Sequence, residues 1–259
     1  MSRILKVAAA QLGPIALDEP RSSAVGRMIA LLQNAKAQGA ELVIFPELAL
    51  TTFFPRWYTE DQSEIDKYFE TEMPNKDTEP LFAEARKLKI GFNFGFAELV
   101  VEKRVTRHFN TAIIVDQQGR IAAKYRKIHL PGHTENEPWR AFQHLEKRYF
   151  EKGNLGFQVH QVFGGKIGMC ICNDRRWPET FRVMGLQGVE LVALGYNTPA
   201  HYPLAPEHDH LQDFHNHLVL QAAAYQNGTW IVGVAKAGRE EDCDLIGGTC
   251  IIAPTGEIV

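Results

Sequence analysis

An internal repeat is the feature that most constrains how this chain can fold. The segment QGAELVIFPE at residues 38–47 resembles the segment QGVELVALGY at residues 187–196. In each copy a glycine ends an amphipathic helix, and a short apolar strand follows that glycine. The likeness extends in both directions, so that each half of the chain reads strand, helix, strand, helix, strand and then a hairpin. We therefore expect two similar halves.

The repeat also predicts the fold class. Helices that alternate with short strands rich in Val, Ile and Phe are typical of α/β proteins. Two such sheets can stack face to face with helices outside, which gives a four-layer α-β-β-α sandwich with an internal pseudo-twofold repeat. No linker rich in Pro, Gly or Ser separates the halves, so we expect a single domain over residues 1–259. Because the second copy stops within its hairpin, we also expect that a C-terminal segment is missing.

Composition and charge narrow the function classes. The 259 residues carry a formal net charge of only -3, without long runs of like charge, so nucleic acid and anionic membranes are poor candidate partners. No apolar run approaches the roughly 18 residues of a membrane span, and the N-terminus lacks the apolar core of a signal peptide. We therefore expect a cytoplasmic protein. Four cysteines do not make a disulfide scaffold.

Active sites of open α/β sheets gather at the carboxyl ends of strands, and two charged residues stand at such ends. Glu47 follows the apolar run LVIF, where a carboxylate is costly to desolvate and its pKa rises, as suits a general base. A solvated loop glutamate is the alternative. Strand alternation places Lys127 at the end of an apolar face, although a fraying strand end is the alternative there. Lys124 and Arg126, on the opposite face, are expected to be solvated.

The segment KIGMCICNDRRWPE at residues 166–179 supplies the third candidate. Cys170 lies within the predicted strand, where a free thiol packs as a small hydrophobe. Cys172 is the last strand residue, and Pro178 and Glu179 suit the first turn of a following helix. A thiol at such a tight turn is expected to be exposed, beside backbone N–H groups that can bind an anion. A single C-x-C pair gives little support for a disulfide or a zinc site.

Together these three segments resemble a known family. The sequences FPE, YRKIHLP and CND with RWPE are similar to the motifs of the carbon–nitrogen hydrolase (nitrilase) superfamily, and the likeness covers essentially the whole chain. The resemblance implies a catalytic triad of Glu47, Lys127 and Cys172. It also implies that Glu146, in HLEKRYFEKG, orients the lysine and the attacking group. On the sequence alone, a surface residue of a helix is the alternative for Glu146.

Three longer segments are most similar to the N-carbamoyl-D-amino acid amidohydrolases of this superfamily. They are CNDRRWPE, KIHLPGHTENEP and QHLEKRYFEKGN. The resemblance implies cleavage of N-carbamoyl-D-amino acids to a D-amino acid, carbon dioxide and ammonia through a carbamoyl-enzyme, without a cofactor. Such a substrate carries a carboxylate, which the guanidinium forks of Arg175 and Arg176 can bind, although one of them could serve a structural carboxylate instead. Members of the family are homo-oligomers, so we expect a dimer or tetramer.

Further polar residues near the predicted nucleophile are candidates for the pocket. Asn173 follows the cysteine, and its backbone N–H can help Lys127 to stabilise an oxyanion. Asn197 and Thr198 lie at the strand end that the repeat equates with the region of Glu47, and we expect them to contribute polar groups to the substrate site.

Histidines and aromatic residues complete the list of candidates. His129 and His144 are expected in the pocket wall or directly behind it. The segment EHDHLQDFHNH at residues 207–217 is expected to form one helix whose histidines lie seven apart. Metal ligands on helices usually lie four apart, so we expect no metal, and we place His215 near the pocket. Aromatic residues that could line an apolar part of the pocket are Phe53, Phe54, Trp57, Trp139 and Phe142.

Three alternative functions stay open at this point. Within the same superfamily, the chain could be a β-ureidopropionase, a plain amidase or a nitrilase, although a neutral nitrile needs no arginine pair. A non-catalytic metal-binding module, built on the histidine-rich segment and the two neighbouring cysteines, belongs to a different class. A papain-like protease is disfavoured because its cysteine has a different local signature. Preference for a D or an L substrate follows only from the resemblance.

Overall fold

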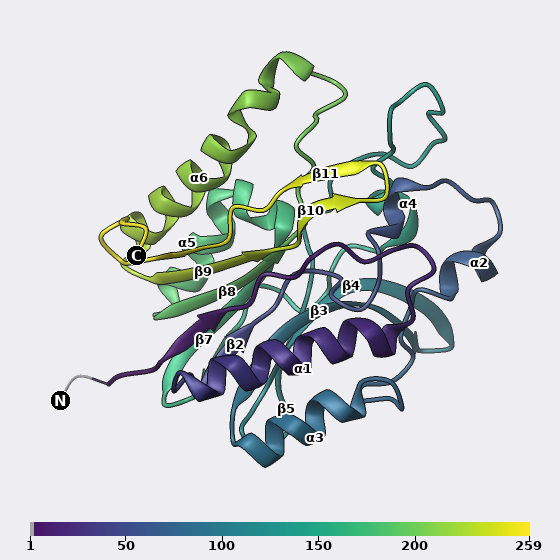
Figure 1. Ribbon diagram of the computed structural model, residues 1–259. Helices are drawn as coiled ribbons and strands as arrows, with labels where there is room; N and C mark the ends of the chain where they lie inside the picture. The colour runs from purple at the N-terminus through teal and green to yellow at the C-terminus, as the bar shows by residue number, and fades with distance from the viewer. Residues whose placement is uncertain (1–2) are drawn as a thin grey trace.

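The computed structural model describes residues 3–259 and places two five-stranded β-sheets face to face (Figure 1). The first sheet contains β1 (Val7–Ala9), β2 (Leu42–Ile44), β3 (Gly91–Glu102), β4 (Val105–Val115) and β5 (Ile121–Arg126), hydrogen-bonded in that order. The second contains β6 (Val159–Val162), β7 (Gly165–Ile171), β8 (Leu191–Tyr196), β9 (Trp230–Ala235) and β12 (Cys250–Ile252), in the order β12-β9-β8-β7-β6. In each sheet three neighbouring strands are parallel, namely β1 to β3 and β7 to β9.

Helices cover the outer face of each sheet, which confirms the predicted four-layer sandwich. The helices α1 (Arg21–Ala37) and α3 (Glu79–Leu88) pack on the first sheet, and α5 (Pro178–Leu186) and α6 (Gln212–Asn227) pack on the second (Figure 1). Two short helices, α2 (Gln62–Asp66) and α4 (Glu146–Tyr149), lie outside this repeat. Short 3-10 helices are η1 (Phe54–Arg56), η2 (Cys172–Arg176) and η3 (Pro206–Leu211). No helix within residues 3–259 has the length and apolar character needed to cross a membrane.

The layer between the two sheets forms the main core. Ile44 and Ile114 of the first sheet belong to the same buried cluster as Met169 and Val192 of the second. Strand β8 is buried at every position, which its continuous apolar run explains, since a central parallel strand is covered on both faces. The sheets are therefore held together by apolar contact, and the carboxyl ends of β2 and β8 come to lie at one shared edge.

The second half of the repeat departs from the first in an added hairpin and in its histidine-rich segment. Strands β10 (Ala237–Glu240) and β11 (Cys243–Ile246) form a separate hairpin. The prediction of one helix over residues 207–217 is wrong, because η3 precedes α6 there. Asp209 explains part of the difference. Its carboxylate accepts hydrogen bonds from the Tyr202 backbone N–H at 2.6 Å and pairs with His201 Nδ1 at 2.7 Å, which ties the segment to the preceding loop.

The outer face of β5 is less solvated than the alternation of its residues predicts. Arg126 is only 4% exposed, and its Nε donates to Glu98 Oε2 at 2.7 Å. Its guanidinium also lies over the ring of Phe109, with 3.9 Å between the guanidinium carbon and the ring centroid. Lys124 pairs with the same glutamate at 2.6 Å. The expectation of a solvated face is therefore wrong for Arg126, because a buried carboxylate on β3 draws the cation inward.

Candidate active site

Glu47 lies between the two sheets, three residues after β2. The following residue, Leu48, has a φ of 45°, which turns the chain away from the strand direction. Strands from both halves come close to this turn. A Cβ atom added to Gly95 of β3 would lie 2.9 Å from the Cα of Glu47, and one added to Gly195 of β8 would collide with the backbone N of Glu47. Both glycines are therefore required for the backbone to approach so closely.

Lys127 joins Glu47 and Glu146 in one buried ionic cluster. Lys127 follows the end of β5, and its Nζ donates to Glu47 Oε1 at 2.9 Å and to Glu146 Oε2 at 2.6 Å. The side chains of all three residues are completely buried. His144 contacts the other oxygen of Glu146 at 3.1 Å, and Asn110 Nδ2 donates to Glu47 Oε1 at 2.8 Å. We call Glu47, Lys127 and Glu146 the buried cluster; the contact from Asn110 was not predicted from the sequence.

The two carboxylates of the buried cluster have pKa values that are shifted in opposite directions. Burial raises the pKa of Glu47, and the attraction of Lys127 offsets only part of that effect. Burial also opposes the charge of Lys127, but the two carboxylates outweigh it and raise the pKa of the lysine. For Glu146, the attraction of Lys127 and the hydrogen bond from His144 overcome burial and lower the pKa. Glu47 is therefore the carboxylate that gains a proton more readily, as a general base must.

Cys172 begins η2 at the end of β7, with a φ of 46°. The prediction of an exposed thiol is wrong, because only 5% of Cys172 is accessible, at the wall of a cavity. Its Sγ lies 3.9 Å from the backbone oxygen of Asn197. Burial raises the pKa of the thiol, the charge of Glu47 raises it further, and Lys127 and Arg175 oppose the rise. The raised pKa favours the protonated thiol. Cys170 is buried within β7.

Asp174, which was not predicted from the sequence, holds the turn that presents Cys172. Its buried carboxylate accepts hydrogen bonds from the Ile171 N–H at 3.0 Å, the Tyr125 hydroxyl at 2.8 Å and the His129 N–H at 2.9 Å. These donors come from β7, from β5 and from the chain just after β5. Asp174 therefore links the cysteine turn to the strand that carries Lys127. Its position within CND was the only available signal in the sequence.

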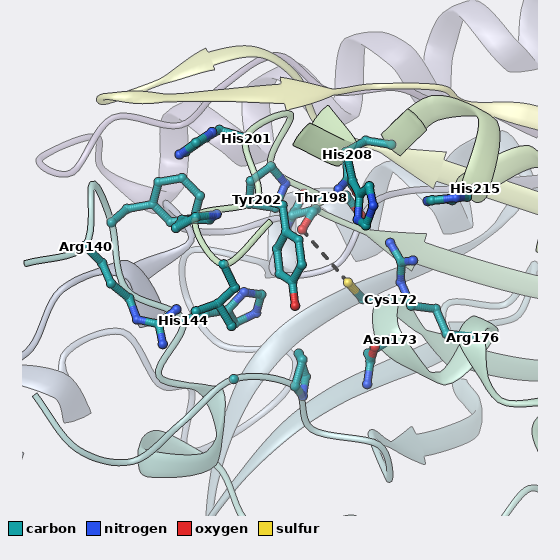
Figure 2. Close-up of a pocket in the computed structure, with 18 of the residues that line it drawn as sticks. Arg140, His144, Cys172, Asn173, Arg176, Thr198, His201, Tyr202, His208 and His215 are labelled. Atoms are coloured by element: carbon teal, nitrogen blue, oxygen red, sulfur yellow. Dashed lines mark hydrogen bonds between the residues drawn. The ribbon is translucent and has the colours of Figure 1, made fainter. Parts of the chain in front are cut away.

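A cavity of about 650 Å³ opens beside Cys172. Figure 2 shows Cys172, Asn173 and Arg176 on one side of the cavity and Arg140 and His144 on the other. Arginine and histidine make up eight of the twenty described residues that line it, and none of these twenty is an aspartate or a glutamate. The residues that line it are Pro131, Gly132, His133, Arg140, Phe142, His144, Cys172, Asn173, Arg175, Arg176, Asn197, Thr198, Pro199, His201, Tyr202, Pro203, Leu204, His208, Gln212 and His215.

The two neighbouring arginines have different environments. Arg175 is only 2% exposed, and it donates to the backbone oxygen of Cys172 at 2.7 Å, to Asn216 at 3.0 Å and to Thr198 Oγ1 at 2.7 Å. Its guanidinium is thus committed to protein atoms. Arg176 is exposed and lines the cavity, and its side chain makes no hydrogen bond with any other described residue. Arg176 is therefore the member of the pair that is available to a ligand.

Some of the remaining predicted pocket residues line the cavity, and others hold the residues that line it. Asn197 contacts Glu47 twice, because its backbone N–H donates to Oε2 at 3.1 Å and its Nδ2 donates to the backbone oxygen at 2.8 Å. Asn173 Nδ2 donates to the backbone oxygen of His129 at 3.1 Å. His144 lines the cavity, whereas His129 lies behind the wall, between the rings of Phe157 and Trp177.

The aromatic residues expected to line the pocket are mostly elsewhere. Phe142 lines the cavity, but Phe53 and Phe54 are buried in a separate apolar cluster. Trp57 lines a smaller neighbouring cavity, and Trp139 is 76% exposed. Within residues 3–259, no group of three or more His, Cys, Asp or Glu side chains is arranged to hold a metal ion.

Comparisons with known proteins agree on one family. The family model for carbon-nitrogen hydrolase matches residues 6–259. The chain is 30% identical to the N-carbamoylputrescine amidase of Arabidopsis thaliana over 88% of this chain and 73% of that protein. It resembles a carbon-nitrogen hydrolase from Helicobacter pylori G27 with a TM-score of 0.82 and 22% identity, over 98% of this chain and 84% of that one. A mutant amidase from Nesterenkonia sp. AN1 (TM-score 0.76, 20% identity, covering 98% and 87%) carries an acrylamide adduct on its active-site cysteine.

Proposed function

The chain belongs to the carbon–nitrogen hydrolase family, and we propose that within this family it hydrolyses N-carbamoyl-D-amino acids. As a member it is an enzyme that acts on carbon–nitrogen bonds other than peptide bonds. One observation carries the narrower proposal: the cavity beside Cys172 presents an unpaired Arg176, with Arg140 and several histidines, and has no acidic side chain among its described lining residues. Such a lining favours a substrate with a carboxylate and disfavours one that ends in an ammonium group.

The first half of the proposed reaction transfers the carbamoyl group to the enzyme. Glu47 removes the proton of the Cys172 thiol, and the sulfur attacks the ureido carbonyl carbon. Lys127 and the backbone N–H of Asn173 stabilise the resulting oxyanion. The bond from that carbon to the amino-acid nitrogen breaks, and Glu47 returns its proton to the departing amine. Glu146 holds Lys127 in position through the 2.6 Å ion pair. The D-amino acid is released, and an S-carbamoyl cysteine remains.

The second half removes the carbamoyl group with water. Glu47, again deprotonated, takes a proton from a water molecule that attacks the thioester carbon. The carbon–sulfur bond breaks, Glu47 returns the proton to Cys172, and carbamic acid leaves and decomposes to carbon dioxide and ammonia. The raised pKa values of Glu47 and Cys172 support this assignment, since a neutral thiol needs a base and a carboxylate with a raised pKa is an effective one.

Substrate comparison tests the proposal directly. Ammonia release is measured for paired D- and L-N-carbamoyl amino acids, for N-carbamoylputrescine, for a plain amide and for a nitrile. We expect kcat/KM to be highest for the N-carbamoyl-D-amino acid and to fall sharply when its carboxylate is esterified. Preference for the L enantiomer, for N-carbamoylputrescine or for the nitrile would contradict it. Cys172→Ala provides the inactive reference.

We also propose that the protein is a homo-oligomer and that the outer face of α5 and α6 contributes to the interface. Phe214, Leu218 and Tyr225 of α6 are 57%, 48% and 70% exposed, and Leu218 and Tyr225 are separated by about two helical turns. Leu186 at the end of α5 is 72% exposed. Neighbouring exposed apolar residues of this kind are typical of a protein contact surface. Light scattering should give at least a dimer, and Leu218→Glu should shift the mass toward the monomer; a monomeric wild type would disprove it.

A further inference from the structure

A second buried ionic cluster lies beneath the loop that follows Glu47. Lys236 and Glu240 are completely buried, and Arg56 is only 4% exposed. Lys236 Nζ donates to Glu240 Oε2 at 2.5 Å, and Arg56 Nη1 donates to Glu240 Oε1 at 3.2 Å. The two cations share this single carboxylate. We call Lys236, Glu240 and Arg56 the support cluster; the reaction proposed above uses none of its members.

The support cluster contacts the loop that carries Glu47. Lys236 Nζ donates to the backbone oxygen of Thr51 at 3.1 Å. The Glu240 carboxylate accepts the backbone N–H of Phe53 at 2.8 Å and that of Ile15 at 3.0 Å. The chain from Glu47 to η1 is thus held at two positions, Thr51 and Phe53, by buried charges. Because these groups are shielded from water, loss of either contact would leave a buried polar group without its partner.

The same cluster reaches the segment that carries Glu146. The backbone oxygen of Arg56 accepts from the Gln143 N–H at 3.3 Å, and that of Pro55 accepts from the Leu145 N–H at 2.8 Å. Leu145 immediately precedes α4, whose first residue is Glu146. The loop after Glu47, which the support cluster contacts, therefore also makes backbone hydrogen bonds to the segment that carries Glu146.

The charges of the two clusters are complementary. The buried cluster has two carboxylates and one lysine, whereas the support cluster has two cations and one carboxylate. Lys127 after β5 and Glu146 on α4 are the charged groups that act most strongly on the pKa of Glu47, while the charge of Glu47 in turn acts on Cys172 after β7 and, more weakly, on Lys236 after β9. Lys236 is thus a second lysine, besides Lys127, whose charge favours the ionised carboxylate.

We propose that the support cluster is a positioning element of the active site, which places Glu47 and the Glu146 segment and keeps Glu47 ionised. The inference depends on Glu47 acting as the base that activates Cys172. It does not depend on which carbon–nitrogen compound is the substrate. Removing a support-cluster cation should therefore make Glu47 harder to ionise, whereas removing the Glu240 charge should not.

Alkylation of Cys172 by iodoacetamide measures this effect without any substrate. The rate is followed by intact mass as a function of pH, with Cys172→Ala as the unreactive reference. We expect Lys236→Met to move the acid limb of the rate profile to higher pH, by a few tenths of a pH unit to about one pH unit, because loss of a nearby positive charge disfavours the ionised form of Glu47. Lys87→Met, which removes an exposed lysine paired with Glu84 on α3, is the matched control and should leave the limb in place.

Two further variants keep the test decisive if Lys236→Met folds poorly. Arg56→Met removes the other cation while keeping the backbone contacts to Gln143, and it should move the limb in the same direction. Glu240→Gln should not move it upward. A limb that stays in place in both cation variants, with only a lower melting temperature, would mean that the cluster serves stability alone and would overturn the proposal. If the alkylation result holds but no carbamoyl substrate is turned over, the substrate assignment is wrong and the positioning role stands.

Discussion

The buried cluster and the large cavity lie on either side of Cys172, and they differ in whether their charged side chains are paired. In the cluster, Glu47, Lys127 and Glu146 are inaccessible to water and each contacts another charged member. Arg176 lines the cavity and makes no hydrogen bond with any other described residue. Under the proposed mechanism, proton transfer and substrate selection are therefore physically separated. Changes in the buried cluster should therefore lower kcat, and changes in the cavity should raise KM.

The largest effect is expected from Glu47→Gln. The substitution keeps the shape of the side chain but removes the base and one negative charge next to Lys127. Because general-base catalysis contributes about 10²–10⁴-fold, we expect kcat to fall by about that factor with little change in KM. Steady-state kinetics on the preferred carbamoyl substrate gives both values. If the variant kept a normal kcat and showed only a raised KM, the separation of roles between the two regions would be wrong.

Arg176→Ala should give the opposite pattern. A hydrogen bond to a charged group contributes about 1.5–3 kcal/mol, so KM should rise by about 10- to 100-fold while kcat changes little. The methyl ester of the substrate should erase the difference between the variant and the wild type. Arg104→Ala, which removes an exposed arginine between β3 and β4 that does not line the cavity, is the matched control and should behave as the wild type.

The acid side of the wild-type pH profile should report the buried cluster and not the cavity. Glu47 must be deprotonated to accept the thiol proton, and burial raises its pKa. Activity should therefore be lost as the pH falls, about tenfold per pH unit below a midpoint that lies above the usual range of a glutamate. Measurement of kcat/KM between about pH 4 and about pH 9, a range that includes the titration of a carboxylate with a raised pKa, checks this prediction. A midpoint at or below the ordinary glutamate value would contradict the role of burial.

Arg140→Ala should have the smallest effect. Arg140 also lines the cavity, but it already forms an ion pair with Glu137. A paired arginine near the surface contributes about 0–1 kcal/mol, so KM should rise by less than about fivefold. An effect as large as that of Arg176→Ala would show that the ion pair with Glu137 opens when substrate binds. The pairing of an arginine in the free enzyme would then not decide whether it binds the substrate.

The fold was predictable because it depends on local periodicity repeated twice. The segments that precede Glu47 and Asn197 share the same order of helix, glycine and apolar strand, and the sheets follow from that order. The split of the histidine-rich segment was not predictable, because it depends on a contact between Asp209 and a loop several residues earlier. Local pattern contains no information about that contact.

Only the site residues that stand at the ends of strands could be predicted from the sequence. Glu47, Lys127 and Cys172 each stand at or just beyond a strand end, and the structure brings two of them into direct contact. The roles of Arg126 and Arg175 were hidden, because both cations turn inward toward partners on other elements. The burial of Cys172 was hidden for the same reason, since the walls that cover it come from loops distant in the sequence.

The two glycines that flank the backbone of Glu47 limit how this enzyme can change. Gly95 and Gly195 come from different halves of the duplicated chain, yet each leaves room for the same few backbone atoms. A side chain gained at either position would push the base out of line, whatever happened at the other. Neither half of the repeat can therefore gain a side chain at this point, and variation of the substrate cavity is expected in the surrounding segments rather than at these two positions.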